Sequence, residues 1–158
     1  MGDVIDARAA LELAVISLAA GAGREADWAP MEASLAGLAE AIAAGDLEAA
    51  LQQHLEFHLG ILRAAHLPAL ELMLRPLHQV VMLSSSPPTA ENPSQWELEA
   101  HREVLAQLRR RDPEAARAAL ARHYRELEQG PYREFRAARF REAPSVRAIV
   151  DRRLRGPA

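Results

Sequence analysis

The chain has 158 residues, of which 49% are hydrophobic, and a formal net charge of -3, so it is long enough to bury the core of a single domain. It has no cysteine, which excludes disulfides and thiolate chemistry, and all 19 basic residues are arginine, which excludes a catalytic or phosphate-binding lysine. No apolar run approaches the roughly 18 residues that a membrane span needs, and the N-terminus lacks a signal-peptide core, so a cytoplasmic protein is expected.

Alanine, leucine, glutamate and arginine dominate the chain, and no alternating β-branched run is long enough for a strand. Helical periodicity predicts six helices, at residues 4–20, 25–44, 47–65, 68–83, 95–111 and 113–129, with a shorter helix or two following to residue 154. Gly45 is expected to stop the second helix, and Asp112 and Pro113 to start the sixth as N-cap and first helical residue. Short connections between long helices predict an all-α antiparallel bundle of six to seven helices.

Four of the six histidines lie on apolar stripes of three predicted helices: His54 and His58 on the third, His101 on the fifth and His123 on the sixth. Each buried imidazole needs a polar partner, and converging imidazoles cannot all be charged, because like charges in contact repel strongly at low dielectric. A divalent metal satisfies both conditions, since it takes the neutral nitrogen lone pairs. An i, i+4 pair also presents two imidazoles to one ion. The spacing therefore predicts a metal site formed by these four side chains.

A different interpretation of the histidines stays open. A single histidine on an apolar face is usually a core residue that is hydrogen-bonded to a neighbour, as in a metal-free interaction module. His78 has apolar neighbours at helical spacing and is either a ligand-contacting residue or a plain core or boundary residue. His66 ends the third predicted helix and is interpreted as a capping or surface residue.

Three segments resemble the FCD domain, the all-helical effector-binding half of FadR-type regulators in the GntR family. "DARAALELAVISLAA" is similar to the opening helix of that family, "HLEFHLGIL" to a segment that normally reads Asp-x-x-Phe-His, and "EAHREVLAQLRRRDPEAARAALARHYREL" to its closing helix pair. The resemblance covers residues 3–130, and residues 131–158 are expected to form a helical extension of the same domain. In metal-binding members one aspartate and three histidines hold a divalent ion, which by position implies His58, His101 and His123 here.

The sequence departs from the family pattern at the first ligand, because His54 occupies the usual aspartate position. A shell of four histidines carries no ligand charge and disfavours hard, carboxylate-preferring ions. The expected cofactor is a divalent ion, zinc or nickel ahead of iron or copper. The alternative is that His54 does not ligate and three histidines leave open coordination positions.

The resemblance also implies a small organic acid as effector, bound at the metal or in the cavity beside it. Arg8 matches the arginine of the family's first helix and is the candidate clamp, because a guanidinium binds a carboxylate bidentately. His78 is the second candidate ligand-binding residue. The alternative for Arg8 is a surface pair with Glu12 at i+4.

The function implied by the resemblance is effector sensing in a FadR-type GntR transcriptional regulator that forms a homodimer through its first and fourth helices. Such regulators carry a winged helix-turn-helix before the FCD domain. Residue 4 already begins the first helix, so this chain is expected to have no DNA-binding domain and no direct DNA contact. The alternative is a stand-alone metal-dependent enzyme for oxygen or hydrolytic chemistry. Glu56 and Glu99 lie near the histidines in sequence but are predicted to point to other helix faces, which favours a non-enzymatic role.

Overall fold

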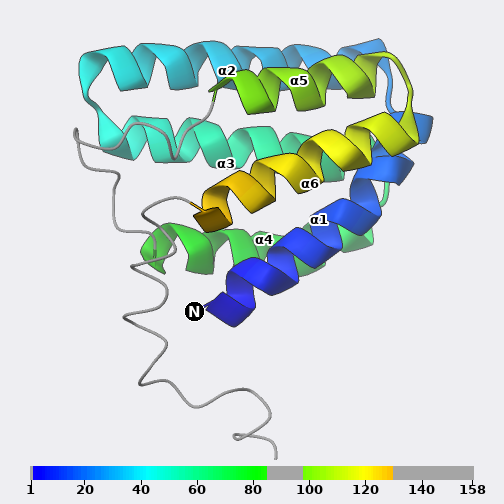
Figure 1. The fold of residues 1–158 in the computed structure, drawn as a ribbon, viewed down its shortest axis with the longest axis horizontal. Helices are drawn as coiled ribbons and strands as arrows, with labels where there is room; N and C mark the ends of the chain where they lie inside the picture. Colours follow the sequence, from blue (N-terminus) through cyan, green and yellow to red (C-terminus); the bar gives the residue numbers. More distant parts are fainter. Residues whose placement is uncertain (1, 85–97, 130–158) are drawn as a thin grey trace, which may run out of the picture.

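A computed structural model describes the backbone of residues 2–84 and 98–129, and the side chains of residues 9–76 and 98–124. All regular structure in these ranges is helical: α1 (Gly2–Ala22), α2 (Glu25–Ala44), α3 (Leu47–Ala64), α4 (Pro68–Ser84), α5 (Leu98–Arg109) and α6 (Pro113–Gln129). Each helix runs roughly opposite to the one before it (Figure 1). The predicted all-α antiparallel bundle is therefore confirmed, and the helices expected beyond residue 129 lie outside the described residues.

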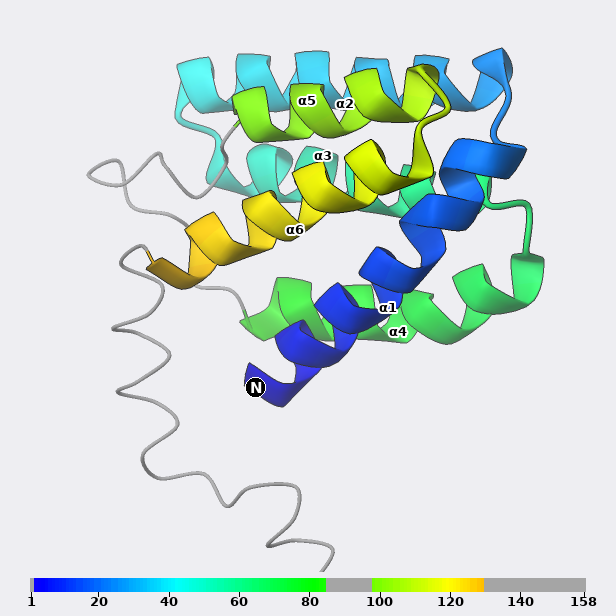
Figure 2. The ribbon, with the colours of Figure 1, turned by 45° about the vertical axis from the view of Figure 1, so that its right-hand side comes forward.

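Helix α3 occupies the centre of the bundle. It packs against α2 on one side and against α1 and α4 on the other, while α6 lies between α5 and α1 (Figure 2). The largest apolar side chains that are almost fully buried are Trp28, Phe57, Ile16, Met31, Leu38, Ile61, Leu62, Leu74, Leu108 and Leu120. None of the helices in the described part of the chain is both long enough and apolar enough to cross a membrane.

The predicted helix ends are set by the expected local chemistry. Gly45 adopts a left-handed conformation, with φ of 69°, directly after α2. Asp46 caps α3 by accepting a hydrogen bond from the backbone N–H of Ala49 at 3.0 Å. Asp112 caps α6 in the same way, accepting from the N–H of Ala115 at 2.9 Å. These contacts therefore define the short connections between α2 and α3 and between α5 and α6.

Helix α1 is longer than its predicted range of 4–20. It continues through Gly21 to Ala22, and the N–H of Gly23 still donates to the carbonyl of Ala19 at 2.8 Å. Gly23 also lies against the Trp28 ring, since a Cβ there would come within 2.2 Å of that side chain. Gly21 therefore stays within the helix, and Gly23, which follows the helix, is the position that must be small.

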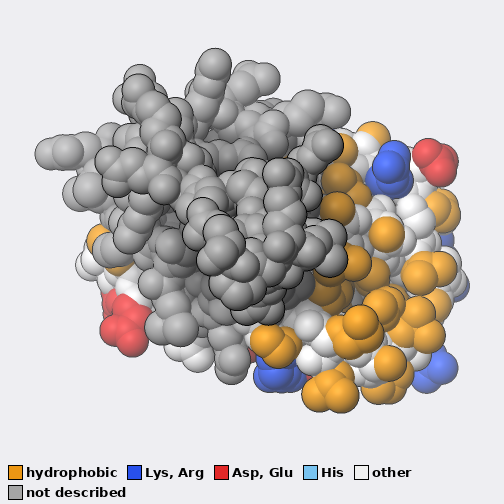
Figure 3. Space-filling model, turned by 90° about the horizontal axis from the view of Figure 1, so that it is seen from below, with side chains coloured by type: hydrophobic (Ala, Val, Ile, Leu, Met, Phe, Trp, Pro, Cys, Tyr) orange, Lys and Arg blue, Asp and Glu red, His pale blue; other side chains and the backbone are white. Residues whose placement is uncertain are grey.

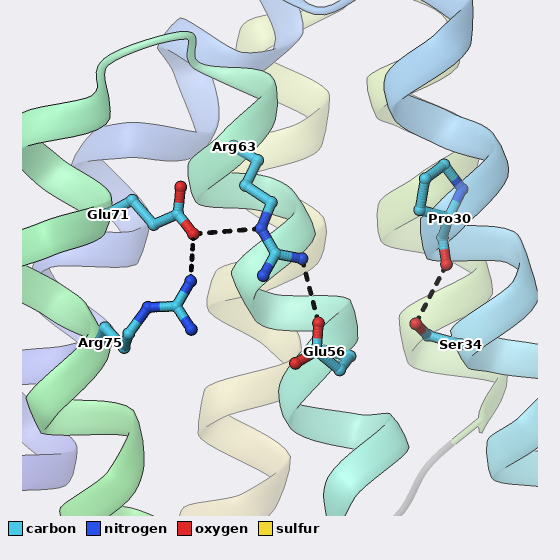
Figure 4. A network of polar contacts seen from close by, with 6 residues as sticks. All are labelled: Pro30, Ser34, Glu56, Arg63, Glu71 and Arg75. Carbon is cyan, nitrogen blue, oxygen red and sulfur yellow. Dashed lines mark hydrogen bonds and ion pairs between the residues drawn. The ribbon is translucent and has the colours of Figure 1, made fainter.

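Polar contacts fasten α4 to α3 (Figure 4). Arg63 of α3 donates to Glu71 of α4 at 3.2 Å and to Glu56 at 3.0 Å, and Arg75 also donates to Glu71. Partial burial disfavours ionisation of Glu71, but hydrogen bonds from Arg63 and Arg75 outweigh it and hold the pKa of Glu71 below its usual value. The modest stabilisation from this half-exposed network is present at neutral pH and is lost as the pH falls through that lowered pKa.

Replacing Gly60 with alanine is expected to destabilise the bundle. An added Cβ would lie 2.4 Å from Cγ of Met31, a fully buried residue of α2. Overpacking costs about 1–3 kcal/mol, which exceeds the helix-propensity gain of about 1 kcal/mol. Thermal or urea unfolding should therefore place Gly60→Ala below the wild type.

The matched control is Gly21→Ala, because Gly21 is helical and a Cβ there would meet nothing within 4 Å. That substitution should be neutral or stabilising by up to about 1 kcal/mol. Equal stability of the two variants would contradict the close approach of α2 and α3.

Candidate metal centre

The structure brings together all four histidines that the sequence predicted as metal ligands. His54 and His58 come from α3, His101 from α5 and His123 from α6. Their candidate ligand nitrogens all lie within 4.8 Å of one another, and none of the four side chains is more than 9% exposed. Three helices that are separate in sequence therefore direct their imidazoles to one buried point in the bundle.

The spacing of the ring nitrogens suits a single cation. Nε2 of His58 lies 3.2 Å from Nε2 of His54 and 3.4 Å from Nε2 of His101. Tetrahedral zinc with nitrogen ligands at its usual bond length separates neighbouring nitrogens by about 3.3 Å. The whole group spans up to 4.8 Å, so ring movements on the order of 1 Å would close a four-nitrogen shell.

The far side of the His58 ring fixes which nitrogen faces this point. Nδ1 of His58 lies 2.7 Å from Oε2 of Glu12, which is fully buried on α1. An ionised carboxylate only accepts, so beside ionised Glu12 the hydrogen lies on Nδ1 of His58, and Nε2 of the neutral ring then presents a lone pair to His54 and His101. A lone pair with two other imidazole nitrogens at 3.2 and 3.4 Å is the arrangement that a shared divalent ion satisfies.

Glu12 and Tyr124 are functional candidates that the sequence did not predict in this role. The Tyr124 hydroxyl donates to the same Oε2 of Glu12 at 2.6 Å, and Tyr124 directly follows His123 on α6. The sequence suggested Glu12 only as a partner for Arg8. A signal was present, because Glu12 shares a helical face with buried Ile16 and Ala19, where an acid needs a specific partner.

The FCD domain family matches residues 3–126. The chain belongs to the FCD domain family. FCD domains are the all-helical, effector-binding and non-enzymatic regulatory domains of GntR-family regulators, so the resemblance seen in the sequence is confirmed.

Two solved structures show the same fold. A GntR protein of Streptococcus agalactiae is 25% identical, with a TM-score of 0.68 over 80% of this chain and 57% of that one. McbR/YncC of E. coli is also 25% identical, with a TM-score of 0.66 over 79% of this chain and 64% of that one. The present chain thus spans less than two thirds of either structure. No curated protein matches it in sequence.

The donor set of this FCD domain could hold a metal ion, and it is entirely nitrogen among the described residues. His54 stands where the sequence resemblance led us to expect an aspartate, and its Nε2 faces His58 rather than solvent. Borderline ions such as zinc, nickel and copper accept neutral imidazoles, whereas magnesium and calcium prefer oxygen ligands. The residues present therefore fit a borderline divalent ion.

Glu56 and Glu99, which lie near the histidines in sequence, face away from this centre, as predicted. Glu56 is half-exposed and pairs with Arg63, and Glu99 is exposed and pairs with Arg102. Neither is among the groups that surround the imidazoles.

The remaining predicted residues lie on or beside the helices. Arg8 is on α1 and His78 on α4, but their side chains fall outside those described, so their effector-binding roles stay predictions. His66 follows α3 at the surface, as expected, with a positive φ of 53°, and its Nε2 lies 2.9 Å from Oδ2 of Asp27.

Proposed function

We propose that this FCD domain is the effector sensor of a GntR-type transcriptional regulator and that it holds a divalent metal through His54, His58, His101 and His123. The observation that supports this most strongly is the convergence of four buried imidazoles within 4.8 Å. Zinc or nickel is the expected ion, with iron or copper as alternatives, because the ligands are neutral nitrogens. Elemental analysis of untagged protein tests this directly, and about one such ion per chain is the expected content.

The proposed effector is a small organic acid. Four neutral ligands leave the double positive charge of the ion without a compensating ligand charge, so an anion is attracted to it. Ions that take five or six ligands keep positions for a carboxylate, and zinc can expand from four ligands to five. Arg8 and His78 are the residues proposed to contact the rest of the acid, with the guanidinium of Arg8 as a bidentate clamp.

Calorimetry with acetate, succinate and citrate tests the effector proposal. We expect at least one of these acids to bind metal-loaded protein, and this binding to disappear after the metal is stripped and the chelator removed by desalting. Identical binding before and after complete metal removal would contradict a role for the metal.

We further propose that the domain forms a homodimer through an apolar surface on α1, on α4 and on the residue that precedes α4, defined by five exposed residues. They are Leu11, Leu18, Leu67, Leu72 and Met73. Figure 3 shows apolar side chains gathered on the lower face of the molecule, where α1 and α4 lie. Leu11 and Leu18 are two helical turns apart and share a face of α1, which suits packing against another helix.

A Leu72→Glu, Met73→Glu double variant is expected to be monomeric. These side chains are 76% and 69% exposed, so charge there should oppose association without disturbing the bundle core. Light scattering should give twice the 17.3 kDa chain mass for the wild type and a single chain mass for the variant. Ala43→Glu, an exposed change on α2, is the control and should stay dimeric. A monomeric wild type or a dimeric double variant would contradict the proposal.

In this scheme the metal and its acid bias the position of the helices, and the shift passes to an attached DNA-binding domain. Such coupling needs an effector that binds the two arrangements with different affinity.

A further inference from the structure

Glu12 is a fully buried acid in the middle of α1. Buried acids are rare unless they are paired, because burial removes the water that stabilises their charge. In this bundle two donors from different helices point at one oxygen: Nδ1 of His58 at 2.7 Å and the hydroxyl of Tyr124 at 2.6 Å. Both distances are short, as expected when the acceptor carries a charge.

The contact to His58 controls how that ring meets a metal. An imidazole that donates Nδ1–H to a carboxylate is held in one tautomer and one orientation, and its opposite nitrogen becomes a better electron donor. In His58 that opposite nitrogen, Nε2, is the one that lies near both His54 and His101. Glu12 therefore contacts a candidate ligand without belonging to the ligand group itself.

The charge of Glu12 matters because the four candidate ligands carry none. No carboxylate belongs to the ligand group found among the described residues. A divalent ion in this interior would be costly without a nearby negative charge. Glu12 is one hydrogen bond away from a ligand and can offset part of the charge of the ion.

The same carboxylate joins three helices. It lies on α1, accepts from His58 on α3, and accepts from Tyr124, the neighbour of His123 on α6. A metal that fixes the rings of His58 and His123 would therefore also fix the two donors that hold Glu12. The effect of metal binding would therefore reach α1, none of whose described side chains belongs to the ligand group.

We propose that Glu12 is a positioning residue that orients His58 for the metal and transmits metal binding to α1. This inference rests on the proposed metal-binding function. Tyr124 restrains the carboxylate from the α6 side, so that its Oε2 stays directed at Nδ1 of His58.

The test compares Glu12→Gln and Glu12→Ala with the wild type by three measurements. Zinc affinity is measured by competition with a chromophoric chelator. The tautomer of His58 is read from the ¹⁵N shifts of the ring, and the protection of α1 from hydrogen exchange is measured with and without zinc. The glutamine keeps an acceptor but loses the charge, whereas alanine loses both.

Zinc affinity is expected to fall about 10-fold in Glu12→Gln and about 100-fold in Glu12→Ala. In Glu12→Ala the His58 ring should also become a mixture of tautomers, and zinc should no longer increase the protection of residues 9–22. Glu56→Gln is the matched control, because Glu56 lies two residues from both His54 and His58 on the same helix but is half-exposed and pairs with Arg63. This variant should behave like the wild type in all three measurements.

Tyr124→Phe removes one of the two hydrogen bonds to Glu12 without changing the acid. It keeps the inference testable if Glu12→Ala fails to fold. It should weaken zinc binding and reduce the zinc-dependent protection of α1, with smaller effects than Glu12→Gln. Wild-type zinc affinity and wild-type α1 protection in both Glu12→Gln and Tyr124→Phe would overturn the inference and leave the metal site standing. Absence of zinc binding by the wild type would instead overturn the proposed function.

Discussion

Replacing His101 with alanine is expected to lower the affinity of the FCD domain for zinc or nickel by more than about 100-fold. Replacing a residue that hydrogen-bonds to a metal ligand typically lowers metal affinity 10–100-fold, and this substitution removes a ligand itself. His101 is the only candidate ligand on α5, and its ring is fully buried, 4.2 Å from the ring of His123 and 4.8 Å from that of His54 between centroids. No other described side chain is placed to substitute for it.

Competition with a chromophoric chelator measures this loss. His66→Ala is the matched control, since His66 is an exposed histidine that pairs with Asp27 away from the four-histidine group. Unchanged affinity in His101→Ala, or an equal loss in His66→Ala, would contradict the proposed centre.

The same titration decides the role of His54. If His54 ligates, His54→Ala should weaken zinc binding as His101→Ala does. His54→Asp should then restore binding and improve the relative affinity for harder ions such as manganese, because a carboxylate oxygen replaces a nitrogen. If three histidines suffice, both variants should retain affinity near that of the wild type.

Removing the metal is expected to destabilise the whole bundle. An ion that binds only the folded chain stabilises it by about 4 kcal/mol when its free concentration is 1,000 times its dissociation constant. For a chain of this size that corresponds to a rise in Tm on the order of 10 °C. The effect should be large because the proposed ligands come from α3, α5 and α6, so that one ion would join three helices of the bundle.

Circular dichroism melts with zinc and after chelation measure this difference. His101→Ala provides the control, because it should show little or no zinc-dependent shift. A wild-type Tm that is the same with and without zinc would show that the ion does not bind the folded bundle preferentially.

Much of the fold follows from local sequence chemistry. The range of α2 is the predicted one because Gly45 provides a left-handed stop directly after it. The start of α6 is also as predicted, because Asp112 and Pro113 act as N-cap and first residue. The predicted end of α1 was wrong because Gly21 remains helical. Only the position of the Trp28 ring shows that Gly23 is the glycine that leaves no room for a side chain.

The convergence of the histidines could be predicted because helical periodicity places each of them on a buried face. Periodicity could not supply the distances between the histidine nitrogens, since these depend on how α5 and α6 are placed relative to α3. It also missed the role of Glu12, whose partners His58 and Tyr124 are 46 and 112 residues away in sequence. Long-range polar pairs of this kind leave only a weak local trace, here an acid on an apolar stripe.

X-ray absorption at the zinc edge of the loaded, untagged protein tests the shared cation most directly. The proposed centre predicts four nitrogen neighbours at about 2.0 Å, with the outer-shell scattering of four imidazole rings. His54→Ala should remove one ring from that signal and His66→Ala none. A shell dominated by oxygen, or one that contains two imidazoles or fewer, would contradict a metal centre built from these histidines.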